Sequence, residues 1–542
     1  MLSNEALKIF GRTSAVISGI EATPSVELSR ADKNKLILIE LRDGALKKAG
    51  QIYIVGSVPH LVMPDGRMVA LLPKTPAMDE ILIACGVMPE SSTLDKALFR
   101  FLLADSSFPE NEIIGLFKYR PAEHELLVNL HEGHYLRFGG DGCPSVHVNG
   151  ERGLLFTQGG EGHMPDLDLI GNYQGGAFSW NEDSPLVKHV FSVGVYSPTS
   201  GVGRQVAIDV ELAWLLAGMF QERVKAQPLL HLHGLGGTRK TAIATALGWV
   251  ISPKGMGFHV VAAPDDRGQM ETTLINADGL LCLDEANNLR LMFSLLKAII
   301  TNATIERRIL YTTANIQRFV VRLLCILTTN HLEMTDEQVA RRVLKVDMGN
   351  PSGVEASYRG DGAVEREWRE GNLRHVCFTD LLCRAGAAMR LLTAARAKSE
   401  DEPVVRYRMS GFWSLILAVA NQEGPEILER MTKAAEDINA EQSRSVNTSD
   451  DLLPLLQDWL EKRPENQGKD LSASEIGEDL TRTNIYLSAS TAKLLGSALM
   501  LSNKLTSSSE YVRLLGMEVV NSRRTKKFRF DLSKVKPEDL RA

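Results

Sequence analysis

The stretch GLGGTRKT, from Gly234 to Thr241, carries the residue types that a phosphate-binding loop requires. In a glycine-rich turn, successive backbone N–H groups can point at a phosphate, a lysine can reach its oxygens, and a hydroxyl can bind Mg²⁺. We assign nucleotide binding to the following residues: Gly234, Gly236, Gly237, Thr238, Arg239, Lys240 and Thr241. One position is discordant, because Arg239 stands where the pattern has a glycine before the lysine.

Two acidic residues follow an apolar run further along the chain, in GLLCLDEANN. Asp284 lies 44 residues after Lys240 and would complete a Mg²⁺ site with the hydroxyl of Thr241. The next residue, Glu285, would orient and polarise an attacking water. Lys240, Asp284 and Glu285 are therefore candidate catalytic residues.

Two further candidate catalytic motifs follow the acidic pair. The apolar run RLLCILTTN ends in Asn330, which is 45 residues after Glu285 and is suited to contact a γ-phosphate or the attacking water. In DEQVARRVLKV, which we expect to be a helix, either Arg341 or Arg342 could reach a neighbouring subunit's nucleotide as an arginine finger.

Each motif also has a purely structural explanation. An Asp-Glu pair at a strand end is often a helix cap, and paired arginines usually lie on a solvated helix face. The order of the motifs favours a nucleotide site, because the lysine, the acidic pair and the asparagine all occur at the ends of successive predicted strands.

Strands and helices must alternate from Leu229 to Met348 to position these residues. This alternation is typical of a parallel sheet that is covered on both faces, with its ligand site at the carboxyl ends of the strands. The predicted fold class is therefore α/β. We expect the Asp284 strand to lie beside the strand that leads into the loop.

This order of motifs resembles the AAA+ class of ATPases, and Leu229 to Met348 resembles the superfamily 3-like helicase ATPases of phages, plasmids and other mobile elements, including primase-associated forms. The closer likeness rests on ATIERRILYTTANIQRFVVRLLCILTTN, where two β-like runs precede the Asn330 strand. A comparable hairpin in that family grips DNA in a ring channel, which implies DNA contacts for Arg307, Arg308 and Arg318. The alternative is a surface hairpin with solvated arginines.

The resemblance implies ATP and Mg²⁺ as cofactors, single-stranded or forked DNA as a partner, and a homo-oligomer in the form of a hexameric ring. It extends more weakly to the β-rich text that precedes the central region. A primase site there is disfavoured, because Asp166 and Asp168 follow no apolar strand and have no third acid that we can place.

The C-terminal part of the sequence predicts a winged helix. LSASEIGEDL has a serine N-cap, SASTAKLLGSALMLS would be the recognition-type helix, and GMEVVNSRRTKKFRFDLS would form two strands around a basic tip. The candidate DNA-binding residues of this tip are Arg523, Arg524, Lys526 and Lys527. A protein-interaction module or a solubilising hairpin is the alternative.

Five regions are predicted along the chain: an N-terminal α+β region without an assigned role at 1–106, with KLILIEL as one of its strands; a β-rich module at 107–200; the ATPase core at 201–350; a helical lid or bundle at 351–447; and the winged helix at 448–542. The 542 residues are 44% hydrophobic and 24% charged, which is typical of a globular protein.

Composition also limits the possible function classes. No apolar run approaches the ~20 residues that span a bilayer, and no secretory signal is visible, so we expect a cytoplasmic protein without a membrane partner. Six scattered cysteines argue against a zinc ribbon or a disulfide framework. The net charge of −6 means that nucleic-acid contact would depend on local patches.

The sequence as a whole predicts an ATP-dependent oligomeric DNA helicase or translocase that acts in the replication of a phage-like or other mobile element. Two alternatives remain open. One is an ATP-binding assembly switch or anti-phage defence ATPase without unwinding activity, and the other is a DNA-binding protein with a degenerate ATP site.

Overall fold

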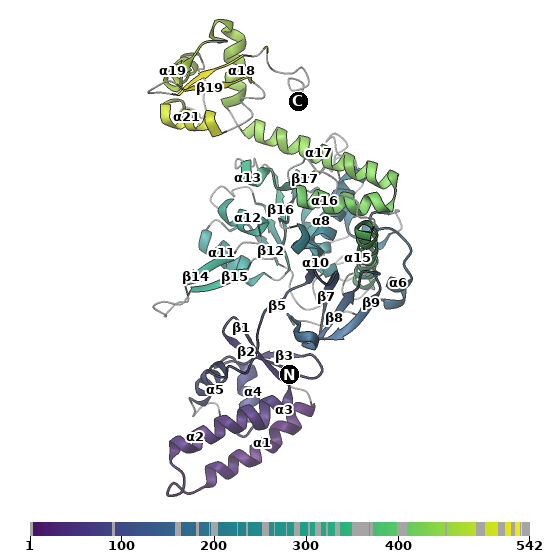
Figure 1. Cartoon of the computed structure of the whole chain (residues 1–542), viewed down its shortest axis with the longest axis vertical. Coiled ribbons are helices and arrows are strands. Elements are labelled where there is room, and N and C mark those ends of the chain that lie inside the picture. The colour runs from purple at the N-terminus through teal and green to yellow at the C-terminus, as the bar shows by residue number, and fades with distance from the viewer. Residues whose placement is uncertain are drawn as a thin grey trace. The chain divides into compact units, whose positions relative to one another are not determined.

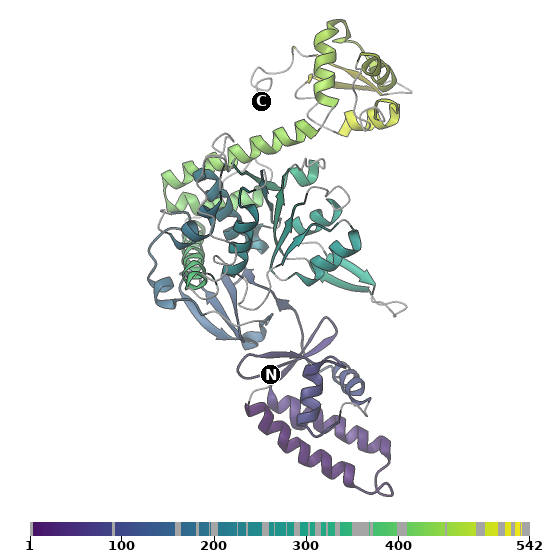
Figure 2. The same cartoon turned by 180° about the vertical axis from the view of Figure 1, so that it is seen from behind.

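The chain forms two compact units in the computed structural model shown in Figure 1 and, from behind, in Figure 2. The first unit comprises Met1–His331 and Leu344–Ala435, and the second comprises Leu332–Val343 and Glu436–Ala542; each is described by itself. The structure describes residues 4–88, 93–157, 164–179, 184–194, 196, 204–224, 226–234, 237–251, 259–264, 266–277, 279–286, 293–301, 304–308, 316–320, 323–330, 337–349, 368, 372–397, 409–449, 452–483, 494–507, 515–521, 526–531 and 533.

The N-terminal part of the first unit packs helices against a small sheet. Its helices are α1 (Asn4–Ala22), α2 (Arg30–Ile39), the π-helix η1 (Glu40–Leu46), α3 (Lys47–Ala49), α4 (Pro76–Ala84) and α5 (Leu94–Leu103). Its strands, in the order β3-β2-β1-β4, are β3 (Met68–Ala70), β2 (Val58–Val62), β1 (Gln51–Val55) and β4 (Glu110–Asn111). Phe10, Leu61 and Leu98 belong to the shared apolar core.

The run KLILIEL at 35–41, for which the sequence predicts a strand, is helical, and that prediction is wrong. Its branched apolar residues favour a strand locally. The helix start signal overrides them, because the Ser29 hydroxyl accepts a hydrogen bond from Asp32 N and caps α2. Ile37 and Leu41, one turn apart, then both enter the core.

A four-stranded antiparallel sheet follows in the order β6-β7-β8-β9. Its strands are β6 (Phe117–Arg120), β7 (Glu125–His131), β8 (His134–Phe138) and β9 (Pro144–Val148). Beside it, β5 (Ile113–Ile114) pairs in parallel with β10 (Leu155–Phe156), and the 3-10 helix η3 (Glu151–Gly153) precedes β10. These strands lie in the region for which the sequence predicts a β-rich module.

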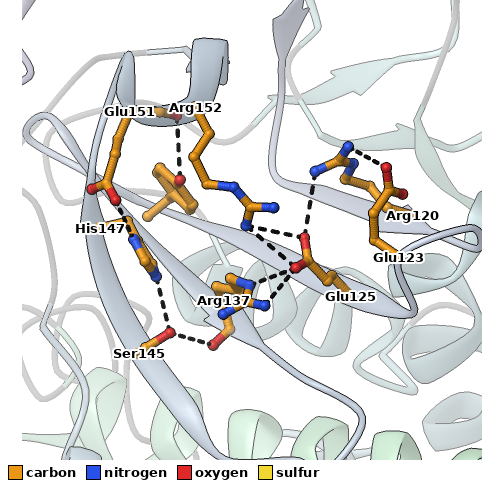
Figure 3. A network of polar contacts seen from close by, with 9 residues as sticks. Arg120, Glu123, Glu125, Arg137, Ser145, His147, Glu151 and Arg152 are labelled. Atoms are coloured by element: carbon orange, nitrogen blue, oxygen red, sulfur yellow. Dashed lines mark hydrogen bonds and ion pairs between the residues drawn. The ribbon is translucent and has the colours of Figure 1, made fainter.

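Three guanidinium groups converge on one buried carboxylate of this sheet, as Figure 3 shows. Glu125 is contacted by Arg137 at 2.6 Å, Arg152 at 3.3 Å and Arg120 at 3.4 Å. Burial tends to raise the pKa of Glu125, but the hydrogen bonds and charges of Arg137 and Arg152 hold that pKa below its ordinary value. These ion pairs link β7 to β6, β8 and η3.

The central sheet has the strand order β12-β13-β16-β11-β17. Its strands are β11 (Leu229–His233), β12 (His259–Ala262), β13 (Leu280–Asp284), β16 (Leu324–Thr329) and β17 (Val343–Asp347). The pairs β12/β13, β13/β16 and β11/β16 are parallel, and the described residues of β13 and β16 are almost all buried. The predicted α/β class with a parallel sheet is confirmed.

The chain between residues 167 and 449 also contains helices. They include α6 (Leu167–Asn172), α7 (Pro185–His189), the 3-10 helix η4 (Phe191–Val193), α8 (Arg204–Met219), α9 (Gln221–Val224), α10 (Lys240–Ile251), α11 (Arg267–Asn276), α12 (Phe293–Ile300), α15 (Leu373–Ala397), α16 (Ser410–Glu423) and α17 (Pro425–Ser449). Asp166 caps α6 by accepting a hydrogen bond from Leu169 N, which gives this aspartate a structural explanation. Across the part of the chain that the structure describes, no helix combines the length and apolar character needed to span a membrane.

The two β-like runs before β16 form an antiparallel hairpin of β14 (Thr304–Arg308) and β15 (Ile316–Val320). In the register, Glu306 pairs with Arg318, and Arg307 pairs with Gln317. The ribbon of this hairpin extends away from the central sheet in both Figure 1 and Figure 2.

In the described residues of the second unit, helices and a three-stranded sheet surround a separate core. The helices are α18 (Leu452–Lys462), α19 (Ala473–Thr483) and α21 (Ala498–Ser507), and the strands, in the order β18-β20-β19, are β18 (Leu471–Ser472), β20 (Lys526–Arg529) and β19 (Glu518–Asn521). The 3-10 helix η6 (Pro464–Asn466) joins α18 to β18, and the short α13 (Glu337–Ala340) also belongs to this unit. Trp459, Ile476, Leu501 and Phe528 lie in its apolar core.

Candidate nucleotide-binding site

The carboxyl ends of three neighbouring parallel strands bring the motif residues to one edge of the central sheet. Gly234 follows β11, Asp284 ends β13, and Asn330 follows β16. The sequence prediction placed the Asp284 strand directly beside β11, but the structure inserts β16 between them. Chain order alone does not identify neighbours, because crossover connections allow a later strand to insert between two earlier ones.

The loop between β11 and α10 has an unusual backbone at several positions. Gly234 has φ +155°, and a Cβ there would lie 2.9 Å from the backbone oxygen of Met348, so the position is restricted to glycine. Gly237 has φ +84°. Arg239 also has a positive φ, +65°, which is strained for a residue with a Cβ. The substitution noted in the sequence therefore falls where the backbone itself favours glycine, while Gly236 lies outside the described residues.

Lys240, the first residue of α10, is 7% exposed and donates to oxygens of several described residues. Its Nζ donates to Gly234 O at 2.6 Å, to Asn330 Oδ1 at 3.1 Å and to Thr238 Oγ1 at 3.3 Å. Burial lowers the pKa of Lys240, and the negative charges of Asp284 and Glu285 oppose that lowering. The loop, α10 and the end of β16 therefore meet at this ammonium.

A second set of hydrogen bonds converges on Asp284. Thr241 Oγ1, from the first turn of α10, donates to Asp284 Oδ1 at 2.9 Å, and Thr328 Oγ1 donates to the same oxygen. The sequence motifs assign no role to Thr328. The sequence feature that could have indicated a role is its position two residues before Asn330 in LTTN. Its hydroxyl also accepts from Glu285 N at 3.2 Å.

Glu285 leaves the strand in a left-handed conformation, with φ +50°. Its side chain is exposed, whereas Ala286, immediately after it, is buried and donates its N–H to Thr328 O at 2.9 Å. The chain thus turns sharply at the end of β13 and presents a carboxylate beside Asp284.

These oxygens have the chemistry of a Mg²⁺ site of the kind that keeps waters and shares its ion with substrate phosphates. Thr241 supplies a hydroxyl and Asp284 a carboxylate, and both hydrogen bonds to that carboxylate fall on Oδ1. No cluster of three or more His, Cys, Asp or Glu side chains suited to a metal occurs among the residues that the structure describes. The donor set therefore fits an ion that arrives with a phosphate ligand, rather than an all-protein metal cage.

The histidines of β11 have structural partners. His231 Nε2 lies 2.7 Å from Thr329 Oγ1, and His233 Nδ1 lies 2.8 Å from Asp347 Oδ1. Burial lowers the pKa of His231 to about 3, so this ring is neutral near pH 7. Burial would raise the pKa of Asp347, but the hydrogen bond of His233 and the charge of Lys345 hold it below its ordinary value.

Arg341 and Arg342 lie in a turn, and their predicted helical setting is wrong. The helix α13 ends at Ala340, and β17 begins at Val343. The turn closes with a hydrogen bond from Arg342 N to Val339 O at 2.8 Å. The helix ends early because the next residues, Val343 and Leu344, are apolar and become buried as part of β17. Both arginines fall in the second unit, whereas Lys240 and Asp284 belong to the first.

The structure gives positions for five of the seven candidate DNA-binding residues. Arg307 and Arg308 lie on β14, and Arg318 lies on β15. Lys526 and Lys527 begin β20, with Lys526 exposed. Arg523 and Arg524, at the predicted tip, lie outside the described residues.

Comparison with known proteins gives distant structural similarity alone. No protein-family model matches the sequence, and no curated protein matches it. The apo C-terminal region of NrS-1 aligns with 11% identity over 91% of this chain and 98% of that chain, with a TM-score of 0.37. SCCmec type IV Cch, titled an active helicase, aligns with 12% identity over 88% of this chain and 91% of that chain, with a TM-score of 0.41. At these identities the alignments assign no role to individual residues.

Proposed function

We propose that the chain is a P-loop ATPase that binds ATP and Mg²⁺ at the carboxyl edge of the central sheet. One observation carries the proposal: the first two residues of α10 are hydrogen-bonded to the ends of two strands, Lys240 to Asn330 after β16 and Thr241 to Asp284 of β13. They meet at the N-terminus of the 12-residue helix α10, where the N–H groups of the first turn and the helix dipole favour a phosphate.

Each side chain has a definite task in this proposal. Lys240 exchanges its bonds to Gly234 and Asn330 for phosphate oxygens, and Thr241 and Asp284 hold Mg²⁺. When bound, the ion neutralises charge on the phosphate oxygens. Glu285 orients the attacking water and accepts its proton, while Asn330 contacts the γ-phosphate or that water.

Hydrolysis of ATP by two variants tests this assignment. Lys240→Ala should lose both nucleotide binding and turnover, whereas Glu285→Gln should retain binding and lose turnover by about 100-fold or more, because a positioned base contributes at least that much. Glu110→Gln, an exposed carboxylate of β4, is the matched control and should hydrolyse ATP at the wild-type rate. Wild-type turnover in both Lys240→Ala and Glu285→Gln would refute the proposal.

The finer proposal is an oligomeric DNA helicase or translocase that acts in the replication of a phage-like or other mobile element. The β14–β15 hairpin supports it, since it lies between β13 and β16 in the chain and carries Arg307, Arg308 and Arg318. In a hexameric ring, these arginines would contact DNA phosphates, and Arg341 or Arg342 would act on the neighbouring subunit's nucleotide.

The C-terminal unit fits a winged helix in this scheme. Its order α18, β18, α19, α21, β19, β20 places two strands after the third helix, and Lys526 and Lys527 follow the segment between those strands. We propose that α21 and these lysines contact single-stranded or forked DNA.

An ATP-binding assembly switch is a second candidate. The observation that favours it is the positive φ of Arg239, at a loop position where the pattern has glycine. Strand displacement of a forked duplex distinguishes the two, because only the motor separates the strands. Nucleotide-dependent assembly without displacement would support the switch, and absence of nucleotide binding would leave the DNA-binding protein with a degenerate site.

A further inference from the structure

Thr328, in β16, contacts both acidic residues of the candidate site. It is 1% exposed, and its Oγ1 donates to Asp284 Oδ1 while accepting from Glu285 N at 3.2 Å. Its backbone oxygen accepts from Ala286 N at 2.9 Å. One buried residue on the neighbouring strand therefore fixes a carboxylate and two successive backbone N–H groups.

These contacts set the orientation of the Asp284 carboxylate and the backbone conformation of Glu285. Thr241 also donates to Asp284 Oδ1, so both hydroxyls hold the same carboxylate oxygen, and no other bond to this side chain occurs within the described residues. The left-handed φ of Glu285 costs free energy and persists only where neighbouring bonds enforce it. The bonds to Thr328 supply that enforcement.

We propose that Thr328 is a positioning residue of the ATP site, whose hydroxyl aims Asp284 at Mg²⁺ and sets the backbone from which Glu285 reaches the attacking water. This inference rests on the proposed ATPase function. It assigns Thr328 no contact with the nucleotide itself, so the hydroxyl acts through Asp284 and Glu285 alone.

The adjacent residue, Thr329, offers a matched comparison. It is also buried, at 0% exposed, and its hydroxyl is also bonded, but to His231 Nε2 at 2.7 Å. Successive residues of a strand point to opposite faces, so Thr328 and Thr329 differ in face more than in burial. Removing either hydroxyl breaks a buried hydrogen bond, whereas only Thr328 contacts the two acids.

The test compares Thr328→Val, Thr328→Ser and Thr329→Val in the full-length chain. Binding of a fluorescent ATP analogue is measured as Mg²⁺ is titrated and again in the presence of EDTA, and ATP hydrolysis is followed in parallel. Thermal unfolding identifies folded variants. Thr328→Ala, which removes the hydroxyl together with the methyl group, gives a second variant if Thr328→Val does not fold.

In Thr328→Val, the Mg²⁺ concentration for half-maximal nucleotide binding should rise about tenfold, and kcat should fall by a similar factor, since partners of metal ligands commonly contribute 10–100-fold. Binding in EDTA should stay within about twofold of wild type. Thr328→Ser should restore the Mg²⁺ dependence, and Thr329→Val should leave it unchanged.

An unchanged Mg²⁺ dependence in Thr328→Val, or an equal change in Thr329→Val, would overturn the positioning role while leaving the ATPase proposal intact. Failure of the wild-type chain to bind the analogue with Mg²⁺ would overturn the proposed function and this inference with it. The two failures are distinguishable, because the second is read from the wild-type chain alone.

Discussion

Arg239 stores backbone strain in the loop that precedes α10. Its φ of +65° lies in the left-handed region, where a Cβ costs about 1–2 kcal/mol, and its carbonyl accepts a hydrogen bond from Ile243 N at 3.1 Å within the first turn of the helix. The side chain is exposed. The strain is therefore a property of the backbone position, independent of the guanidinium group.

Arg239→Gly should raise the free energy of unfolding by about 1 kcal/mol, because glycine adopts this φ without steric cost. Nucleotide binding should be retained. Denaturant unfolding checks the gain against Arg239→Ala, which keeps the Cβ and should gain nothing. Equal stability of the glycine and alanine variants would contradict the strain argument. A large rise in turnover in Arg239→Gly would show in addition that the arginine restrains hydrolysis.

Glu211, on α8, is a fully buried carboxyl beside the Tyr196 phenol. Tyr196 Oη lies 2.7 Å from Phe191 O and 2.8 Å from Glu211 Oε2. The phenol has one proton, and both the Phe191 carbonyl oxygen and Glu211 Oε2 lie within hydrogen-bond distance of this donor. Burial raises the pKa of Glu211 to about 8, and the hydrogen bond that Tyr196 donates partly opposes the rise.

Stability should therefore fall as pH rises through this group. The folded-state pKa of about 8 exceeds the ordinary 4.5, so the stabilisation is complete below pH 4.5 and is lost as pH rises towards and through 8. Glu211→Gln keeps a donor without a charge and should remove this loss, which corresponds to about 3–5 kcal/mol. Urea unfolding at pH 5 and pH 8.5 measures the difference. Parallel pH profiles for the two proteins would show that Glu211 does not titrate in this way.

At the scale of elements, α8 lies so close to β16 that a Cβ at one helical position would overlap a buried leucine side chain. A Cβ on Gly218 would lie 2.2 Å from Leu324 Cδ2, and Leu324 is 1% exposed and cannot move freely. Gly19, on α1, is a matched helical glycine with no atom within 4 Å of a Cβ at that position. At Gly218, packing therefore opposes the helix propensity that favours alanine, whereas at Gly19 helix propensity acts alone.

Gly218→Ala should lower the free energy of unfolding by about 1–3 kcal/mol through overpacking, although alanine is the better helix former. Gly19→Ala should raise it by up to about 1 kcal/mol. Thermal or denaturant unfolding of both variants gives the signs. A stabilising Gly218→Ala would mean that α8 and β16 do not pack as closely as the structure has them.

The type of an element was predictable where the apolar pattern agreed with the glycine and polar residues at its ends. The apolar runs of β13 and β16, bounded by glycine and polar residues, were readable as buried strands, and GLGGTRKT indicated the turn before α10. KLILIEL was not, because a helix cap at Ser29 outweighs local β preference. The setting of Arg341 was missed for a related reason, since strand pairing of the next residues ends the helix early.

At the scale of the whole molecule, the parallel sheet and the candidate site residues followed from the order of motifs, whereas strand neighbours did not. The insertion of β16 between β11 and β13 depends on tertiary packing, and it is what brings Thr328 against Asp284. A buried threonine in an apolar strand has no distinctive sequence signal. Contacts of this kind appear only when the sheet is assembled.

The central claim concerns one site built from several distant segments, and equilibrium binding of Mg²⁺·ATP tests it most directly. Calorimetric titration of the full-length chain with a slowly hydrolysed ATP analogue should give one site per chain in the presence of Mg²⁺. Lys240→Ala should abolish the binding heat, and Glu285→Gln should preserve it. Binding that is equally tight in Lys240→Ala, or no binding to the folded wild-type chain, would contradict the account.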